Sequence, residues 1–474
     1  MTNKTKIVAT IGPASSSKSV LKKMISSGMD VARLNFSHGS HEEHASVIKK
    51  IRSLSKTMGR PVGIMADLQG PKIRTGELKN NKSVFLKKNR TVLITTKNIP
   101  GTADIISTTY SRLIHDIKEG DTVLVDDGLI ELRVLSKTKD AVSCEVVHGG
   151  LLKEHKGINL PGVNVSAPSL TRKDKRDINF GVKSGVDFFA LSFVRSAKDL
   201  KQIKSVIKKQ GSDIPVIAKI EKPEAVDNLD GVLKIADGIM VARGDLGVEM
   251  KPEKVPTIQK HIIHKAIMAN RPVITATQML ETMIDNPIPT RAETSDVANA
   301  IYDGSDAVML SGETATGQYP DKTVQMMKRI AIEAEISKFM KYNIKYDKDP
   351  DMTVTQAVAQ SSVNILHEMD AKAILVFSVS GKTSKFVSKH RPSKIVYSFS
   401  PTTTICNRLA LVWGIRSQHI PRMKKTEVII EASEKLLSQK ELIKHNDLII
   451  IVTGLALKSG STNLIKIHRV GQKD

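Results

Sequence analysis

Residues 216–221, Val-Ile-Ala-Lys-Ile-Glu, place a lysine and a glutamate two positions apart at the end of an otherwise apolar run. The arrangement recurs in Val-Ala-Arg-Leu-Asn-Phe-Ser at 31–37, Ile-Met-Val-Ala-Arg-Gly-Asp at 239–245 and Val-Met-Leu-Ser-Gly-Glu at 308–313. Side chains i and i+2 project from the same face of a strand. Each stretch therefore predicts a buried strand whose carboxyl end presents its polar side chains on the same face.

These strand ends together supply arginine, lysine, two carboxylates and a hydroxyl. Such a set can hold a metal ion and stabilise a transferring phosphoryl group. A packed core has no need of these charges, and burying them unpaired is costly. We interpret the four stretches as parts of one catalytic site, the alternative being a structural network of ion pairs.

The surrounding pattern predicts an α/β fold, a (β/α)₈ TIM barrel. Strand and helix patterns alternate with short connections, and the eighth strand is followed by a final helix over Pro320–Ile336. The expected strands are Lys6–Ile11, Val31–Phe36, Pro61–Asp67, Phe188–Phe193, Val216–Ile220, Gly238–Ala242, Val273–Thr277 and Ala307–Leu310. Active sites of such barrels lie at the carboxyl ends of the strands, where this pattern places the polar groups.

Two further units are expected beside the barrel. Short β-like runs between turn signals predict an inserted small β-barrel lid domain at 70–168, which divides the catalytic barrel into 1–69 and 169–342. A polar linker, Asn343–Asp351, leads to a C-terminal α/β three-layer domain at 343–474, expected to carry a mostly parallel sheet.

Composition narrows the class of protein. The chain has 474 residues, of which 40% are hydrophobic and only 4% aromatic, so its core must be mainly aliphatic. Cys144 and Cys406 lie far apart without metal-ligand spacing, which favours reduced thiols. The start of the chain runs directly into a strand pattern, and no apolar run approaches the roughly 20 residues of a membrane helix. These features predict a cytoplasmic protein with no membrane partner.

The charge is strongly basic, with 72 Lys and Arg against 49 Asp and Glu, a formal net charge of +23. Such a balance is typical of nucleic-acid or membrane-surface binding. The lysines are nevertheless spread along the whole chain, and aromatic residues for stacking on bases are scarce. We therefore expect no nucleic-acid partner. A non-catalytic binding module, favoured only by the charge, would leave the clustered carboxylates idle.

Eight motifs resemble those of the pyruvate kinase family, in that family's order and over nearly the whole chain. They are ATIGPAS (9–15), ARLNFSHG (32–39), DLQGPKIRTG (67–76), KGINLPG (156–162), AKIEKPEA (218–225), GIMVARGDLGVE (238–249), ATQMLE (276–281) and MLSGETATGQYP (309–320). The resemblance implies phosphate transfer from phosphoenolpyruvate to ADP, giving pyruvate and ATP. It also implies a lid, a regulatory domain and a homotetramer.

The resemblance assigns Glu221 and Asp245 to Mg²⁺, which is satisfied by few carboxylates plus water and substrate oxygens. It places Lys219 against the transferred phosphoryl group and the developing enolate, where a fixed cation stabilises charge. Arg33 becomes a second phosphate clamp, since its planar fork suits phosphate oxygens. Gly244 and Asp245 are expected just before a helical turn whose free N–H groups receive the substrate carboxylate.

Three more positions match the step that protonates the enolate. Thr277 matches the hydroxyl associated with it in the family, and we expect Thr277 to act through water, with Ser311 and Glu313 in the relay. Considered without its motif, a threonine near a strand end is usually structural.

Nucleotide contacts of the family align with Pro13, Asn35, His38, Arg74 and Lys156. Lys156 lies in the inserted domain and Arg74 near its root, so we expect the insertion to close over the phosphates and exclude water. The same insertion argues against the rival class, a metal-dependent lyase or aldolase that handles pyruvate enolate without nucleotide.

One departure from the family concerns potassium. Many members bind K⁺ through residues matching Asn35, Ser37, Asp67 and the Leu68 carbonyl, with an acidic residue where this chain has Lys72. A lysine ammonium carries the same unit charge, so we predict that K⁺ is dispensable. The alternative is that Lys72 is a solvated surface residue.

The C-terminal domain carries a loop that resembles the family's effector-phosphate site. Its residues are Ser378, Ser380, Gly381, Lys382, Thr383 and Ser384, between a strand and a helix. A second loop, Gly454–Thr462, lacks the tryptophan and arginine of some fructose-bisphosphate-regulated members. A sugar monophosphate or AMP is thus as plausible an effector as the bisphosphate, and loss of regulation is the alternative.

Overall fold

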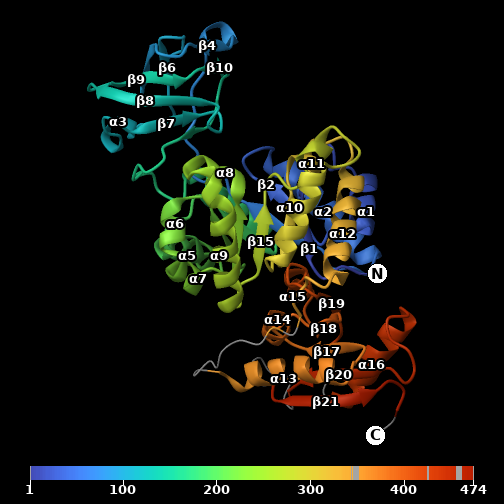
Figure 1. The fold of residues 1–474 in the computed structure, drawn as a ribbon. Coiled ribbons are helices and arrows are strands. Elements are labelled where there is room, and N and C mark those ends of the chain that lie inside the picture. Colours follow the sequence, from blue (N-terminus) through green and yellow to red (C-terminus); the bar gives the residue numbers. More distant parts are fainter. Residues whose placement is uncertain (1, 343, 345–351, 424–425, 455–461, 473–474) are drawn as a thin grey trace.

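A computed structural model describes residues 2–342, 344, 352–423, 426–454 and 462–472. Figure 1 shows three units, with a barrel in the middle, a β-rich insertion at one end of it and an α/β unit at the other. No helix in the described ranges is both long enough and apolar enough to cross a membrane.

The central unit is a closed barrel of parallel strands in the order β1-β16-β15-β14-β13-β12-β3-β2. Its strands are β1 (Lys6–Ile11), β2 (Val31–Asn35), β3 (Gly63–Asp67), β12 (Phe188–Leu191), β13 (Val216–Ile220), β14 (Gly238–Ala242), β15 (Val273–Ala276) and β16 (Ala307–Leu310). They are rich in valine, isoleucine and alanine and almost wholly buried, as strands covered on both faces must be. The predicted barrel is confirmed.

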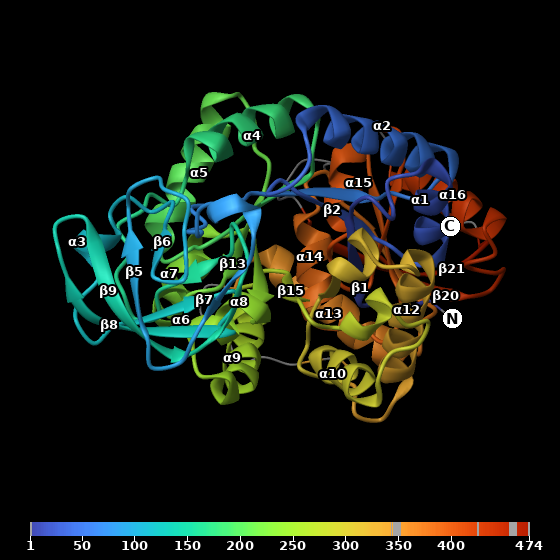
Figure 2. The ribbon, with the colours of Figure 1, turned by 90° about the horizontal axis from the view of Figure 1, so that it is seen from above.

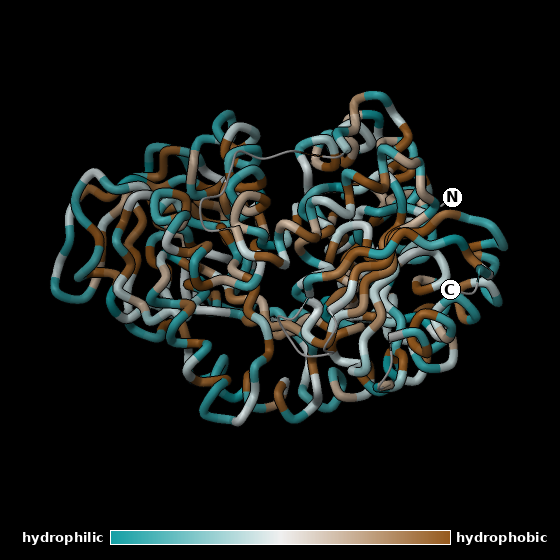
Figure 3. Tube along the Cα trace, turned by 90° about the horizontal axis from the view of Figure 1, so that it is seen from below, coloured by the Kyte–Doolittle hydropathy of each residue, from teal (hydrophilic) through white to brown (hydrophobic). Residues whose placement is uncertain are grey.

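Helices surround the barrel strands, and four of them, α2, α4, α5 and α10, begin with a capping box that satisfies their first N–H groups. The helices of this unit are α1 (Lys18–Ser27), α2 (His41–Thr57), α4 (Arg172–Lys183), α5 (Ala197–Lys209), α6 (Pro223–Asp227), α7 (Leu229–Ile235), α8 (Arg243–Glu249), α9 (Val255–Met268), α10 (Arg291–Tyr302), α11 (Gly312–Ala315) and α12 (Pro320–Ile336). Short 3₁₀ turns cover Pro252–Lys254 and Glu281–Ile284. The hydrophobic segments gather in the strands, and polar ones lie outside (Figure 3).

The chain leaves the barrel after β3, forms the inserted unit and re-enters the barrel at α4. The inserted unit therefore lies over the carboxyl ends of the barrel strands (Figure 1). It has a six-stranded sheet, β11-β7-β8-β9-β5-β6, and a two-stranded ribbon, β10-β4. Its elements are β4 (Val84–Leu86), β5 (Thr91–Thr95), β6 (Ile105–Ser107), α3 (Leu113–Asp116), β7 (Thr122–Val125), β8 (Ile130–Lys137), β9 (Ala141–His148), β10 (Gly150–Leu152) and β11 (Ile158–Asn159), with a 3₁₀ turn at Lys79–Asn81.

The C-terminal unit has three layers around a five-stranded sheet of order β19-β18-β17-β20-β21, parallel except for β21. Helices α13, α14 and α15 share a core with one face, and α16 shares a core with the other. The elements are α13 (Val354–Glu368), β17 (Ala373–Phe377), α14 (Lys382–Lys389), β18 (Val396–Ser400), α15 (Thr403–Leu409), β19 (Ile415–His419), α16 (Thr426–Gln439), β20 (Leu448–Thr453) and β21 (Leu464–Arg469).

The C-terminal unit closes the amino end of the barrel. Ala410 and Leu411, just after α15, pack against Val8, Val31 and Met65 inside the barrel floor. Figure 2 looks down on the molecule from the side of the inserted unit and shows α15 and α14 behind the barrel strands. One end of the barrel is thus plugged by apolar side chains, which leaves the carboxyl end for chemistry.

Candidate active site

Lys219 is the centre of the buried polar network at the carboxyl end of the barrel. Its Nζ lies 2.9 Å from Glu221 Oε1 and 3.3 Å from Asp67 Oδ1, and it donates a hydrogen bond of 2.8 Å to Ser192 Oγ. The lysine side chain is only 11% exposed. The pairing of positions 219 and 221 in one strand end, expected from the sequence, is confirmed, and it joins side chains from β3, β12 and β13.

The charge of Lys219 is fixed by this setting. Burial opposes the ammonium form, but the carboxylates of Asp67 and Glu221 outweigh it and raise the pKa of Lys219 above its ordinary value. A permanently charged ammonium in a site of low dielectric is the arrangement that best stabilises negative charge appearing on a reacting group.

Arg33 lies beside this lysine on the neighbouring strand β2. Its Nε is 2.7 Å from Asp67 Oδ2, and its Nη1 donates to Thr10 Oγ1 at 2.9 Å. Thr10 in turn donates to the Leu310 carbonyl at 2.8 Å, which ties β1 to β16. The third guanidinium nitrogen, Nη2, makes no hydrogen bond within the described ranges of the chain. Arg33 is therefore held rigidly and keeps a donor for a ligand.

Asp67 holds the two cations together. Burial opposes its ionised form, yet Lys219 and Arg33 lower the pKa of Asp67. Its Oδ1 is buried and has no hydrogen-bond partner among the described residues, although Lys219 Nζ lies 3.3 Å away. The resemblance assigned Asp67 to a monovalent-cation site together with the Leu68 carbonyl, which accepts a hydrogen bond of 2.8 Å from Ser192 Oγ.

Glu221 and Asp245 form the expected pair of carboxylates. Glu221 is 1% exposed, and its Oε2 accepts the Phe193 N–H at 2.7 Å. Burial raises the pKa of Glu221, Lys219 opposes the rise, and the charge of Asp245 adds to it, so the two carboxylates repel each other across the site. Two mutually repelling carboxylates are a donor set that a divalent cation relieves.

No cluster of three or more His, Cys, Asp or Glu side chains suited to a metal occurs among the described residues. A divalent ion here would take two protein carboxylates and complete its shell from substrate and water, as Mg²⁺ commonly does. The sequence placed Asp245 before a helical turn, but Gly244 and Asp245 lie inside the first turn of α8.

Thr277 lies just past the end of β15, which ends one residue earlier than the strand predicted over Val273–Thr277. Its φ is +68°, a left-handed conformation that β-branched residues rarely adopt. The hydroxyl accepts the Gly244 N–H at 2.8 Å and donates to the Ala276 carbonyl at 2.6 Å. The N–H expected to receive a substrate carboxylate is therefore bound to Thr277 in this structure.

Arg243 has its ion-pair partner outside the carboxylates of Glu221 and Asp245. Its Nη1 pairs with Asp296 at 2.7 Å, and its Nη2 donates to the Thr277 carbonyl at 2.7 Å. Within the described residues Arg243 makes no ion pair with Glu221 or Asp245, whereas Lys219 does pair with Glu221. Arg243, at the start of α8, instead links the Thr277 carbonyl to Asp296 of α10.

Ser311 and Glu313 begin α11 at the end of β16. Glu313 is 2% exposed, and its two oxygens accept the backbone N–H groups of Ser311 at 2.6 Å and Leu280 at 3.2 Å. Burial raises the pKa of Glu313. In the described part of the chain no hydrogen bond joins Ser311 or Glu313 to Thr277, so their place in a proton relay stays a prediction.

The residues aligned with nucleotide contacts gather on both sides of the barrel mouth. Asn35 Oδ1 accepts the Ser37 N–H at 3.1 Å. Burial lowers the pKa of His38, and the charges of Arg74, Lys72 and Arg33 lower it further, which places the cations of the insertion's root close to the barrel rim.

In the inserted unit, Arg74 donates to the His155 carbonyl at 2.8 Å, and Lys156 pairs with Asp126 at 2.8 Å. Lys72 is half-buried and forms no ion pair within the residues that the structure describes. Pro13 follows the end of β1.

The predicted effector loop lies at the start of α14, where Gly381 has φ +74°. Thr383 Oγ1 contacts Thr462 Oγ1 at 2.7 Å, and Ser384 Oγ contacts Ser398 Oγ at 2.7 Å. Both hydroxyls are buried inside the domain, whereas Lys382 is exposed. Most of the second loop, 455–461, lies outside the described residues.

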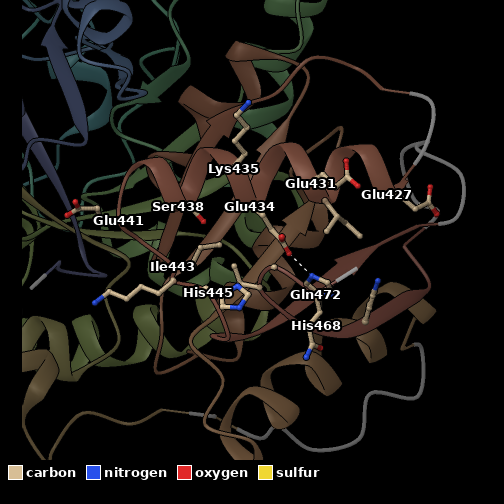
Figure 4. A pocket seen from close by; sticks show the side chains of 15 residues that line it. Glu427, Glu431, Glu434, Lys435, Ser438, Glu441, Ile443, His445, His468 and Gln472 are labelled. Atoms are coloured by element: carbon tan, nitrogen blue, oxygen red, sulfur yellow. Dashed lines mark ion pairs between the residues drawn. The ribbon is translucent and has the colours of Figure 1, made fainter. Parts of the chain in front are cut away.

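A large cavity lies away from the barrel mouth, on the C-terminal unit between α16 and β21 (Figure 4). Its volume is ≈ 1390 Å³ and its lining includes Glu427, Glu431 and Lys435. His468 pairs with Glu434 at 2.6 Å on its wall. It contains none of the clustered residues described above, so its size does not make it the active site.

Sequence reasoning placed most of this site but missed some of its members. Thr10 received no role, although it stands two residues before Gly12 in a motif at a strand end. Ser192, just past the end of β12, bridges Lys219 to the Leu68 carbonyl. Val8 and Gly12, two positions away on either side, carry no polar side chain, so the i, i+2 pattern of the other tracts gives no signal at Thr10.

Comparisons with known proteins agree with this geometry. Family models described as "Pyruvate kinase, barrel domain" and "Pyruvate kinase, alpha/beta domain" match residues 2–324 and 356–468. A pyruvate kinase of Geobacillus stearothermophilus is 46% identical over 473 residues, covering 99% of this chain and 80% of the relative. One from Staphylococcus aureus strain MRSA252 is 43% identical over 474 residues, with 99% and 81% covered.

A solved structure is similar over its whole length. The crystal structure of a pyruvate kinase from Cryptosporidium parvum superposes with a TM-score of 0.92 at 39% identity. The likeness covers 99% of this chain and 96% of that one.

Proposed function

This chain belongs to the pyruvate kinase family of phosphotransferases, and we propose that it moves the phosphoryl group of phosphoenolpyruvate to ADP, giving pyruvate and ATP in the last step of glycolysis. The observation that carries the proposal is the Lys219 ammonium, buried at the barrel mouth between Asp67 and Glu221. A fixed cation beside a carboxylate pair is what a migrating PO₃ unit requires.

Glu221 and Asp245 are the residues that would hold the divalent ion, which the family requires and which we assign as Mg²⁺. When bound, Mg²⁺ supplies positive charge for the oxygens of the reacting phosphate. Lys219 and the open nitrogen of Arg33 would bind the phosphoryl oxygens and stabilise their negative charge.

We assign the substrate carboxylate to the start of α8 and the enolate to Thr277. The N–H groups of Gly244 and Asp245 suit the carboxylate, and the missing side chain of Gly244 permits close approach. This binding requires the Gly244 N–H to exchange its bond to the Thr277 hydroxyl for one to the ligand. Thr277 passes a proton through water to the enolate, with Ser311 and Glu313 in the relay, and this step requires its O–H to leave the Ala276 carbonyl.

The inserted unit acts as a lid over the nucleotide. Pro13, Asn35 and His38 contribute from the barrel, and Arg74 and Lys156 from the lid. Closure brings the lid cations onto the phosphates and excludes water that would otherwise hydrolyse them.

Potassium is expected to be dispensable because Lys72 supplies the same unit charge. The assay is pyruvate formation in buffer whose only monovalent cation is a bulky organic one. Addition of K⁺ should change the rate less than about twofold, and Lys72→Glu should make the enzyme K⁺-dependent. Activation of the wild-type chain by about tenfold or more on adding K⁺ would refute this assignment.

Regulation is assigned to the loop 378–384, where Lys382 is exposed at the start of α14 and can meet a phosphorylated effector. A sugar monophosphate, AMP or fructose bisphosphate fits this chemistry. We further propose a cytoplasmic homotetramer, as is common in the family.

The test of the proposed activity is ADP-dependent pyruvate formation from phosphoenolpyruvate with and without Mg²⁺. The proposal expects turnover only when both are present, with ATP appearing in equal amount. Release of pyruvate without ADP would indicate a lyase or phosphatase, and no turnover under any condition would indicate a binding module.

A further inference from the structure

Glu249, at the end of α8, joins three parts of the molecule through one carboxylate oxygen. Its Oε1 accepts a hydrogen bond from Asn159 Nδ2 at 2.7 Å and from Lys222 Nζ at 2.5 Å. The glutamate side chain is 2% exposed and that of Lys222 is 13% exposed. A buried carboxylate with a paired cation and an amide donor is held firmly, because losing either partner leaves a polar group unsatisfied.

The three residues of this contact, Asn159, Lys222 and Glu249, belong to three different parts of the molecule. Asn159 lies three residues after Lys156, in strand β11 of the lid. In the lid sheet, β11 pairs with β7. Lys222 directly follows Glu221 at the end of β13. Glu249 ends the helix whose first turn contains Asp245, and α8 lies beneath the connection to the lid in Figure 1.

The surroundings show that this contact is a junction rather than part of a continuous core. A cavity of ≈ 40 Å³ lies around it, lined from the lid by Ile158, Asn159 and Val163 and from the barrel by Lys222, Asp245 and Glu249. Lid and barrel are therefore incompletely packed here. A second tie, Arg195 Nη2 to the Ala167 carbonyl at 3.0 Å, holds the returning connection on the other side.

We infer that Glu249 is a positioning residue that couples the lid to the two metal-binding carboxylates. The inference rests on the proposed function, since it takes Glu221 and Asp245 as the metal ligands. Through Lys222, Glu249 pairs the ammonium of the residue that follows Glu221 in the chain, and through Asn159 it holds the lid strand against the helix of Asp245. Movement of the lid is thereby transmitted to the metal site without contact between Glu249 and substrate.

Two variants separate the two arms of this junction. Glu249→Gln keeps the acceptor for Asn159 but removes the charge that pairs Lys222, which becomes free to compete for Glu221. Asn159→Leu removes the lid arm and leaves the ion pair intact. Glu253→Gln, an exposed glutamate four residues beyond Glu249, is the matched control.

The readouts are calorimetric titration with Mg²⁺ alone, amide hydrogen exchange of 156–163 in the ligand-free protein, and KM for ADP. Glu249→Gln should weaken Mg²⁺ binding by about fivefold or more with lid exchange unchanged. Asn159→Leu should speed exchange and raise KM for ADP by about fivefold each, with Mg²⁺ binding unchanged. Glu253→Gln should match the wild type throughout.

The inference is overturned if Glu249→Gln leaves Mg²⁺ binding at the wild-type value, or if Asn159→Leu leaves lid exchange unchanged. It is also overturned if both variants only lower the thermal midpoint, because that marks a purely structural contact. The exchange measurement needs no turnover. A wild-type chain that makes no pyruvate would therefore refute the proposed function while leaving the lid arm of the junction to be judged separately.

Discussion

At the scale of single residues, Thr277 combines a reactive position with a costly backbone. Its φ of +68° is maintained by the hydrogen bond from Gly244 and by Arg243, which binds its carbonyl. Residues held in the left-handed region cost about 1–3 kcal/mol, and they concentrate at functional sites. The strain at Thr277 supports its assignment to the proton step.

Two substitutions isolate this strain, because both remove the hydroxyl. Alanine keeps a Cβ and glycine does not, so Thr277→Gly should be more stable than Thr277→Ala by about 1 kcal/mol. Urea unfolding of the two variants measures the difference. Both should lower kcat. A glycine variant less stable than the alanine variant, as is usual at an unstrained position, would show that the backbone is relaxed.

The sequence predicted those contacts of the site that lie within one strand, such as Lys219 with Glu221. It could not predict contacts between distant strands. Asp67 contacts Lys219 and Arg33, and Arg243 pairs with Asp296 although Asp245 is much nearer to it in the sequence. The register of the barrel strands determines which of these side chains meet. That register is a property of the closed sheet and has no local signal.

At the scale of elements, the start of α4 is tied to the root of the lid through Asp174. This buried carboxylate completes a capping box with Thr171, and its Oδ1 also accepts the Gly70 N–H at 3.1 Å. Gly70 has φ +67°, and a Cβ there would meet the Phe193 and Ser192 side chains at about 3.0 Å. The chain therefore turns into the lid at a position fixed by a helix cap.

Replacing Asp174 by alanine should destabilise the protein by about 2–3 kcal/mol, since a cap and a buried acceptor are lost together. Chemical denaturation measures this loss, and proteolysis near residue 70 should become faster. Asn179→Ala, an exposed position in the same helix, is the control and should change stability by less than about 0.5 kcal/mol. Equal stability of the two variants would contradict the role given to Asp174.

Most elements were predicted from the sequence, including the three-residue strand β4, but several short or mixed elements were not. The strand β19 was missed because Arg416 and Gln418 interrupt its apolar residues at the edge of the sheet. β6, β10 and β11 have only two or three residues each and carry no periodicity. One helix expected over Pro223–Ile235 is two, because Asn228 leaves helical geometry and its side chain bonds the Glu224 carbonyl.

At the scale of the whole molecule, buried charges join the barrel floor to the C-terminal unit. Lys6, at the start of β1, donates to the Ile415 carbonyl of β19 at 2.5 Å. Asp30 pairs with Arg60 at 3.0 Å and with Arg416 at 3.4 Å. Burial lowers the pKa of Lys6 to about 7, with Asp30 opposing the change and the two arginines adding to it.

This lowered pKa predicts how stability depends on pH. Between about pH 7 and 10.5 the unfolded chain holds a proton that the folded chain has released, so stability should rise with pH. Below pH 7 both states are protonated, and the cost of burying the ammonium is fully present. Relative to Lys6→Met, the wild type should gain roughly 1 kcal/mol per pH unit between pH 7.5 and 9.5.

Urea unfolding across this range measures the gain, with Lys22→Met as an exposed control. The difference between wild type and control should stay constant with pH. If the free energy of unfolding depends on pH in the same way in the wild type and in Lys6→Met, then Lys6 keeps an ordinary pKa. In that case Lys6 does not titrate in this range at the contact between the two domains.

The most direct measurement is a single turnover of phosphoenolpyruvate with ADP and Mg²⁺, followed by phosphorus NMR, in the wild type and in Lys219→Met. Removing the ammonium should slow phosphoryl transfer by about 10³-fold while the protein still folds and still binds Mg²⁺. Transfer within about tenfold of the wild-type rate would contradict the account, because the migrating group would then not depend on the cation that Asp67 and Glu221 hold in place.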